Sequence, residues 1–170
     1  MIRSMLDLTN AAERFTSLQK NTSRRLILCA GTGCIANGAL AVSAALTKEI
    51  KARNLPVTVE LREENAEGSL WVSHSGCQGF CQMGPLLSIE PDGILYTHVR
   101  VEDAAEIVER TVIKREVIDR LLYRLPGSDQ AERGTTSIPF YQRQHRMTLS
   151  LCGHIDPESL SEYIARGGYQ

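Results

Sequence analysis

Four of the five cysteines form two closely spaced pairs, and they are the residues in this sequence best suited to chemistry. Cys29 and Cys34 enclose four residues, and Cys77 and Cys81 enclose three. Both pairs lie in glycine-rich stretches, which contain Gly31, Gly33, Gly76, Gly79 and Gly84. A two-iron, two-sulfide core is held by four thiolates. Two such pairs, brought together at the ends of neighbouring strands, could supply them.

The glycines of these stretches are suited to the charge of such a core. Four thiolates on an oxidised two-iron, two-sulfide core leave a net charge of about −2, which reduction changes to about −3. Glycine lets backbone N–H groups come close to the sulfurs and offset that charge. A hydrogen bond to a charged group contributes about 1.5–3 kcal/mol, and about 1.4 kcal/mol corresponds to about 59 mV in a one-electron couple. One N–H···S bond that strengthens on reduction therefore moves a midpoint potential by tens of millivolts.

Other uses of paired cysteines fit the spacing less well. Structural zinc sites and thioredoxin-type dithiols usually place two residues between their cysteines, and neither pair here has that spacing. A Rieske centre needs histidines in both ligand loops, but only His74 lies near one of them. The plant-type ferredoxin spacing matches only in its first half. Zinc binding and unrelated buried thiols remain the alternatives. Cys152 has no partner at a comparable spacing, so we expect it to act as a small buried apolar residue.

A dinucleotide site is a further alternative. The segment Gly31-Thr32-Gly33-Cys34-Ile35-Ala36 follows a predicted strand and fits the pattern G-x-G-x-x-A, and Glu60 lies near the end of the next predicted strand. The cysteines that bracket these glycines, which a pyrophosphate site does not require, argue against it. The following unit also has the pattern of a hairpin rather than of another strand–helix–strand repeat.

Composition narrows the function classes. The chain has 170 residues with 19 basic and 20 acidic side chains, a net charge of −1, and 5% aromatic residues. Near-neutral charge and few aromatic residues argue against nucleic-acid binding. No apolar run approaches the roughly 18 residues of a membrane span, and residues 1–20 lack a secretory apolar core. We therefore expect a cytoplasmic protein, in which cysteines indicate metal or redox chemistry before disulfides.

The elements that must position the cysteines follow from the hydrophobic pattern. The expected order is a helix within residues 1–20, a strand at 24–29, a helix at 36–53, strands at 56–61 and 70–73, a hairpin of 86–89 with 94–99, and a helix over 101–123 that could break near Lys114. This order predicts an α/β fold, a small mixed sheet with flanking helices. Arg24 and Arg25 begin the first strand, and we expect both in solvent.

The carboxyl-terminal part departs from this pattern. Turn-forming residues over 125–138 predict a linker. Beyond it we expect a strand at 147–151 and a helix that begins with Asp156 as its N-cap and stops near Gly167. The predicted organisation is an N-terminal helical extension (1–23), a sheet domain (24–124), the linker (125–138) and the incomplete start of a second domain (139–170).

Both cysteine segments resemble those of a known family. The sequences from Cys29 to Cys34 and from Cys77 to Pro85 resemble the cluster loops of thioredoxin-like 2Fe-2S ferredoxins. The sequence from Leu151 to Tyr169 resembles the entry into the flavoprotein subunit of NADH-linked oxidoreductases. The combination is similar to the N-terminal end of the beta (flavoprotein) subunit of NAD-dependent, electron-bifurcating iron hydrogenases and related formate dehydrogenases. Respiratory complex I, the NADH dehydrogenase, contains relatives of both parts.

The resemblance implies a thioredoxin-like fold, an iron–sulfur cluster bound by Cys29, Cys34, Cys77 and Cys81, and one-electron transfer within a multi-subunit oxidoreductase. It places FMN, NAD and the 4Fe-4S cluster of that family beyond this chain or in partner subunits. No residue here is assigned to hydride transfer, and we expect the chain to be truncated before the flavin site. The alternative function is a zinc-stabilised docking or assembly module of a dehydrogenase complex.

Overall fold

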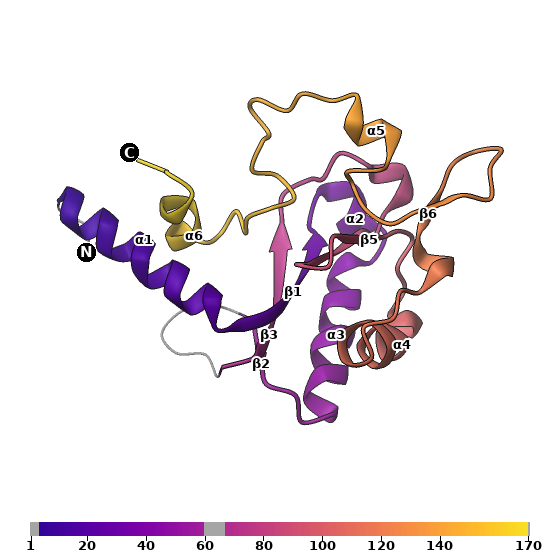
Figure 1. Cartoon of the computed structure of the whole chain (residues 1–170), viewed down its shortest axis with the longest axis horizontal. Coiled ribbons are helices and arrows are strands. Elements are labelled where there is room, and N and C mark those ends of the chain that lie inside the picture. Colours follow the sequence, from indigo (N-terminus) through magenta and orange to yellow (C-terminus); the bar gives the residue numbers. More distant parts are fainter. Residues whose placement is uncertain (1–3, 60–66, 170) are drawn as a thin grey trace.

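The computed structural model describes residues 4–59 and 67–169, and it contains a five-stranded mixed sheet (Figure 1). The strand order is β2-β3-β1-β4-β5, with bounds β1 (Thr22–Cys29), β2 (Val57–Thr58), β3 (Ser69–Ser75), β4 (Leu87–Glu90) and β5 (Ile94–Tyr96). Strand β3 runs parallel to β1 and β2, whereas β4 runs antiparallel to β1 and β5. The predicted hairpin, the mixed sheet and the α/β class are therefore confirmed.

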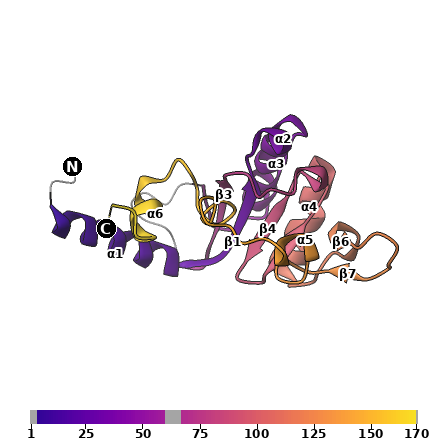
Figure 2. The same cartoon turned by 90° about the horizontal axis from the view of Figure 1, so that it is seen from above.

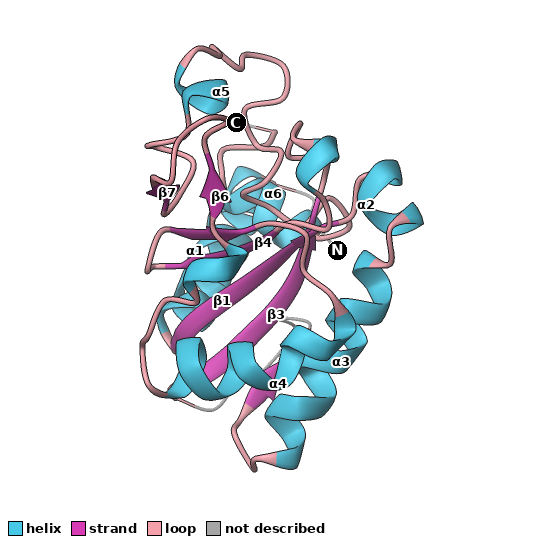
Figure 3. Cartoon of the chain, turned by 90° about the vertical axis from the view of Figure 1, so that its right-hand side faces the viewer, coloured by secondary structure: helices cyan, strands magenta, loops and turns pink. Residues whose placement is uncertain are grey.

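Two helical segments, residues 39–52 and 101–113, cover one face of this sheet (Figure 3). Helix α3 (Ala39–Ala52) buries Leu46 and Ile50 against Leu26 and Leu28 of β1. The helix predicted over 36–53 begins later, at Ala39, because Gly38 has φ 93° and separates α3 from the short helix α2 (Thr32–Ala36). A left-handed backbone conformation of this kind favours glycine. The break leaves α2 free to follow the first cysteine loop rather than the axis of α3.

Helices α1 (Met5–Lys20) and α6 (Leu160–Ala165) lie on the opposite side of the sheet from α3 and pack against each other (Figures 1 and 2). Phe15 of α1 meets Trp71 of β3 edge-to-face, with ring centroids 6.0 Å apart. Helix α6 begins later than predicted, because the N-cap is Ser159, whose hydroxyl accepts from the amide of Glu162 at 3.2 Å. Asp156 instead accepts from the amide of Glu158 in the preceding turn. The strand expected at 147–151 is a series of turns.

Both arginines at the start of β1 are buried, so the expectation that they lie in solvent was wrong. Arg25 forms an ion pair with Glu162 at 2.5 Å, and the exposed fractions of the two side chains are 3% and 0%. Its guanidinium also lies 3.6 Å from the centre of the Trp71 ring and donates to the hydroxyl of Ser73 at 2.7 Å. Arg24 pairs with Asp92 at 2.5 Å and donates to the carbonyl of Val112. A buried guanidinium needs such partners, and most of these are far away in the sequence.

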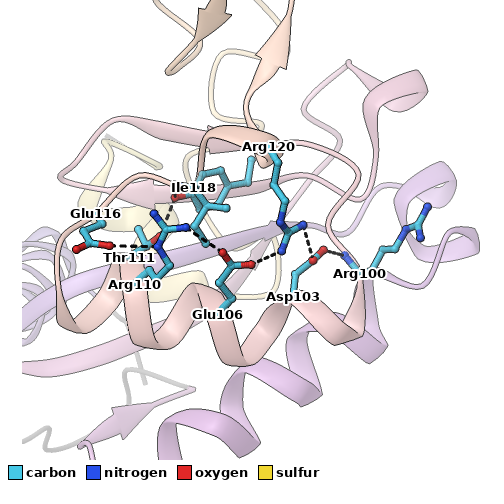
Figure 4. Close-up of polar contacts among 9 residues, drawn as sticks. Arg100, Asp103, Glu106, Arg110, Thr111, Glu116, Ile118 and Arg120 are labelled. Carbon is cyan, nitrogen blue, oxygen red and sulfur yellow. Dashed lines mark hydrogen bonds and ion pairs between the residues drawn. The ribbon is translucent and has the colours of Figure 1, made fainter.

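The helical segment after the sheet begins as a 3-10 turn at Val101–Asp103, continues as α4 (Ala104–Glu106) and widens to a π-helix over Ile107–Ile113. It ends at the break expected near Lys114. The chain that follows is fastened back to this helix by a polar network (Figure 4). Arg120 pairs with Asp103 at 2.8 Å and with Glu106. Arg120, followed by Arg110, lowers the pKa of Glu106, because both cations stabilise its carboxylate.

The segment predicted as a linker (125–138) contains strand β7 (Ala131–Glu132), which pairs with β6 (Tyr123–Arg124) just before it. It is tied to the main sheet, since the amide of Leu95 donates to the carbonyl of Arg133 at 2.8 Å. Helix α5 (Pro139–Gln142) follows. Within residues 4–59 and 67–169, no helix is both long and apolar enough to cross a membrane.

Candidate metal centre

The two cysteine loops meet at one edge of the sheet because β1 and β3 are parallel neighbours. Cys29 is the last residue of β1 and lies opposite Ser75, the last residue of β3. The loops stay paired beyond the strands, since the amide of Ala30 donates to the carbonyl of Ser75 at 2.9 Å. Cys77 follows β3 by two residues. The topology thus places the beginning of each cysteine pair at the same sheet edge.

Short helical turns then carry the second cysteine of each pair. Cys34 lies in α2, and Cys81 begins a 3-10 turn over Cys81–Met83. The sulfurs of Cys77 and Cys81 are 3.7 Å apart. Two thiolates bound to one tetrahedral metal at about 2.3 Å lie roughly 3.8 Å from each other. The second pair is therefore spaced as two ligands of one metal atom.

Glycines allow the two loops to touch. A Cβ atom on Gly31 would lie 2.9 Å from Cβ and 3.1 Å from Cα of Cys77. One on Gly84 would lie 2.6 Å from the sulfur of Cys34. A Cβ atom on Gly33 would lie 3.5 Å from Cβ of Cys81, which is an ordinary contact distance. The first cysteine loop is therefore pressed against both cysteines of the second, and a side chain at Gly31 or Gly84 would disturb the arrangement.

Backbone amides are directed at two of the sulfurs. The amide of Gln78 donates to the sulfur of Cys29 at 3.5 Å, and the amide of Gly79 donates to the sulfur of Cys77 at 3.4 Å. Gly79 has φ 86°, a conformation that other residues rarely adopt. These amides form hydrogen bonds that favour the thiolate over the thiol.

Burial and mutual repulsion act in the other direction. Cys29 and Cys34 are fully buried, whereas Cys77 and Cys81 are exposed. Burial, followed by the neighbouring Cys29 thiol, raises the pKa of Cys34 to about 12. The neighbouring Cys77 raises the pKa of Cys81. Thiols that oppose one another's ionisation need a cationic centre before they can all be thiolates, and iron ions supply such charge. The residues at this edge therefore fit a cluster bound by four thiolates.

The remaining residues singled out in the sequence have different surroundings from the four paired cysteines. The ring of His74 is bonded to the hydroxyl of Ser43 at 3.1 Å rather than directed at a cysteine. Gly31 and Gly33 of the dinucleotide pattern face Cys77 and Cys81 of the second cysteine loop. Glu60 falls outside the described residues. Cys152 is only half-buried, and its sulfur lies 3.2 Å from the position that a Cβ of Gly76 would occupy. It therefore lies beside the second cysteine loop, which its spacing in the sequence did not indicate.

Sequence reasoning also missed a group of residues that packs against the second cysteine loop. Phe80, between the cysteines of the second loop, packs against Tyr123, Phe140 and Tyr141. The guanidinium of Arg146 bonds the carbonyl of Gln78 in the same loop. Nothing in the spacing of these residues pointed to the cysteines. Only the pair Phe140-Tyr141, in a chain with few aromatic residues, could have served as a signal.

Comparisons with known proteins agree with this geometry. Residues 13–112 match the family model described as thioredoxin-like 2Fe-2S ferredoxin. A 2Fe-2S ferredoxin of Clostridium pasteurianum is 36% identical over 62 residues, which are 36% of this chain and 61% of the relative. A 2Fe-2S ferredoxin of Aquifex aeolicus is 39% identical over 51 residues, 30% of this chain and 46% of the relative. The chain thus spans between about half and three fifths of the length of these relatives.

Among solved structures, a wild-type thioredoxin-like 2Fe-2S ferredoxin from Aquifex aeolicus matches with a TM-score of 0.48 and 23% identity, over 60% of this chain and 97% of the other. Another structure of a ferredoxin from that organism matches with a TM-score of 0.47 and 25% identity, over 62% and 96% of the two chains. The family match covers more than half of the present sequence, including both cysteine loops. This chain therefore belongs to the thioredoxin-like 2Fe-2S ferredoxin family.

Proposed function

We propose that Cys29, Cys34, Cys77 and Cys81 hold the 2Fe-2S cluster, and that the chain passes single electrons within an NAD(H)-linked oxidoreductase. The observation that carries the ligand assignment is the contact between the two cysteine loops, in which Gly31 lies against Cys77 and Gly84 against Cys34. When bound, the cluster supplies a one-electron couple between a diferric and a mixed-valence state. The chain needs no general base and no nucleophile for this role.

The protein's own residues set the conditions of that couple. The amides of Gln78 and Gly79 stabilise negative charge on sulfur, and they do so more strongly when reduction adds a further electron. Burial of Cys29 and Cys34 excludes water from one half of the site. Exposure of Cys77 and Cys81 leaves the other half open. Electrons therefore enter and leave on the side of the second cysteine loop.

The assignment to an NAD(H)-linked complex rests on the carboxyl-terminal part of the chain. Residues 139–170 lie outside the family match, and their sequence resembles the entry into a flavoprotein subunit. Glu162 in this part pairs with Arg25 in the sheet, so the segment is joined to the ferredoxin domain by a buried contact. In this proposal, FMN, NAD and 4Fe-4S clusters belong to other domains or partner subunits. This chain then conducts electrons and transfers no hydride.

Metal analysis with ligand variants tests the cluster. Protein purified anaerobically should be red-brown and contain about two iron and two sulfide per chain. Serine in place of Cys29, Cys34, Cys77 or Cys81, one at a time, should remove most of the cluster. The matched control is Cys152→Ser, which should retain it. Equal cluster content in all five variants would refute the ligand assignment.

A redox assay tests the place in the complex. Dithionite should bleach the loaded protein directly, whereas NADH should do so only after an NADH-oxidising flavoprotein is added. Bleaching by dithionite alone, with no response to NADH and flavoprotein of the hydrogenase or formate dehydrogenase type, would leave the electron carrier intact and refute the NAD(H) link.

The second candidate is a zinc-stabilised docking module, which a colourless protein with one zinc per chain would support. One zinc held by all four cysteines needs their sulfurs to surround one point. In the part of the chain that the structure describes, no three such side chains converge in the way a single metal ion requires. Two irons divide the thiols into pairs, and the spacing of Cys77 and Cys81 fits one such pair. The geometry therefore favours the cluster.

A further inference from the structure

A segment beyond the family match reaches the cysteine loops through aromatic packing. Phe80 lies between the ligands of the second loop and stacks on Phe140, with ring centroids 4.6 Å apart and planes inclined by 12°. Tyr141 meets Phe80 edge-to-face at 5.6 Å. Ile138 is fully buried in the same apolar cluster as Cys29 and Cys34. Residues 138–146, which we call the cap, are therefore built onto the site.

Tyr141 brings an unused hydrogen-bond donor to this place. Its hydroxyl is buried and has no hydrogen-bond partner among the described residues. Its side chain packs against the apolar cluster that contains Cys29 and Cys34. Buried hydroxyl groups in proteins are nearly always bonded, and the anionic sulfurs of a bound cluster would provide an acceptor.

Arg146 brings a fixed positive charge to the same loop. Its guanidinium donates to the carbonyl of Gln78, between Cys77 and Gly79, and to the carbonyl of Cys152 at 3.3 Å. It also lies 5.6 Å from the centre of the Tyr141 ring. A Cβ on Gly79 would lie 2.4 Å from this guanidinium. The charge is therefore held against the second cysteine loop rather than in open solvent.

We propose that the cap raises the midpoint potential of the cluster, with the Tyr141 hydroxyl donating a hydrogen bond to cluster sulfur and the Arg146 guanidinium supplying positive charge. The inference rests on the proposed ligand set. Reduction adds one negative charge to the cluster, so a donor and a cation beside it stabilise the reduced form more than the oxidised form. Neither residue is a ligand of the cluster.

The test measures the potential of the loaded, full-length chain by anaerobic redox titration followed by EPR. Tyr141→Phe and Arg146→Gln should each lower the ratio of reduced to oxidised cluster at a fixed potential at least threefold, which corresponds to about 28 mV at 59 mV per tenfold change. The matched controls are Tyr163→Phe and Arg166→Gln, at exposed positions outside the cap, which should leave the ratio unchanged. Unshifted potentials in both cap variants would overturn the proposal.

Two further readouts separate this inference from the cluster assignment. Iron and sulfide content is measured first, because a wild-type protein without a cluster refutes the proposed function, whereas fully loaded variants with wild-type potentials refute only the cap. Exchangeable deuterons near the cluster, detected by ENDOR after transfer to D2O, should lose one strong coupling in Tyr141→Phe. If that variant does not load, Arg146→Gln decides alone, and an unshifted potential there overturns the proposal.

Discussion

Replacing Gly31 with alanine tests whether contact between the two cysteine loops holds the cluster. The backbone of Gly31 has φ −65° and ψ 151°, which alanine adopts without strain. The whole effect must therefore come from the added methyl group. Its carbon would lie 2.9 Å from Cβ of Cys77, about half an ångström closer than the 3.4 Å at which ordinary contact begins, and 3.1 Å from its Cα. Because Cα belongs to the backbone, no side-chain rotation relieves this contact, and the loops must separate.

The expected size follows from overpacking. Extra methylene-sized groups in a packed interior cost about 1–3 kcal/mol. This strain is released when the cluster leaves and the loops part. Since about 1.4 kcal/mol corresponds to a factor of ten, we expect cluster loss from Gly31→Ala to be about tenfold faster than from the wild type.

The assay follows the visible absorption of the loaded protein after an iron chelator is added anaerobically. Gly33→Ala is the matched control, because its methyl group would meet Cys81 at 3.5 Å, an ordinary contact, within the same loop. It should lose the cluster within about twofold of the wild-type rate. If both alanine variants lose the cluster equally fast, the close approach of Gly31 and Cys77 has no role in holding it.

Two more perturbations address the ligands and the carboxyl-terminal segment. In the cluster-free protein at pH 8, exposed Cys77 should react with iodoacetamide well before Cys34. A pKa of about 12 instead of 9 lowers the thiolate fraction of Cys34 about a thousandfold. Mass spectrometry should show the difference between the two reaction rates narrowing as the pH rises, and equal rates at pH 8 would contradict this prediction. Glu162→Gln leaves the Arg25 guanidinium buried without its counter-charge. It should lower the free energy of unfolding by about 3–5 kcal/mol, which corresponds to roughly 6–20 °C in the midpoint of thermal unfolding. A loss below about 1 kcal/mol would show that this ion pair does not hold α6 in place.

The meeting of the two cysteine loops at one sheet edge could be predicted because its information is local. Cys29 follows a run of apolar residues that predicts a strand, and Cys34 lies a few residues further in a glycine loop. The same holds for Cys77 and Cys81 after β3. Parallel strands end at the same edge, so two local patterns suffice to place four thiols together. The later start of α3, at Ala39, was missed because glycine is tolerated in helices, and only the φ of 93° shows that Gly38 precedes the helix.

Contacts between distant residues could not be predicted in this way. Arg25 and Glu162 are 137 positions apart, and no local sequence pattern predicts that their side chains are buried. A charged residue in a strand is usually exposed, so the sequence predicted a solvent-exposed Arg25. Only the structure shows the buried contact with Glu162. Helix α6 starts at Ser159 rather than at Asp156 for a related reason: the amide of Asp156 donates to the carboxylate of Glu162, which is held by Arg25. Tertiary contacts thus decided a boundary that the local capping pattern had placed at Asp156.

The cap extends this argument to function. The family match ends at residue 112, before Tyr123, Phe140, Tyr141 and Arg146. The matched part contains every proposed ligand, so it can define which cluster is bound. The charge and hydrogen bonding around the cluster depend also on the segment that follows, because Arg146 is bonded to the loop between the ligands. A change in how this segment packs would shift the potential without altering a ligand. On our proposal, the segment that leads toward the flavoprotein part is also the one that sets the energy of the electron it would exchange.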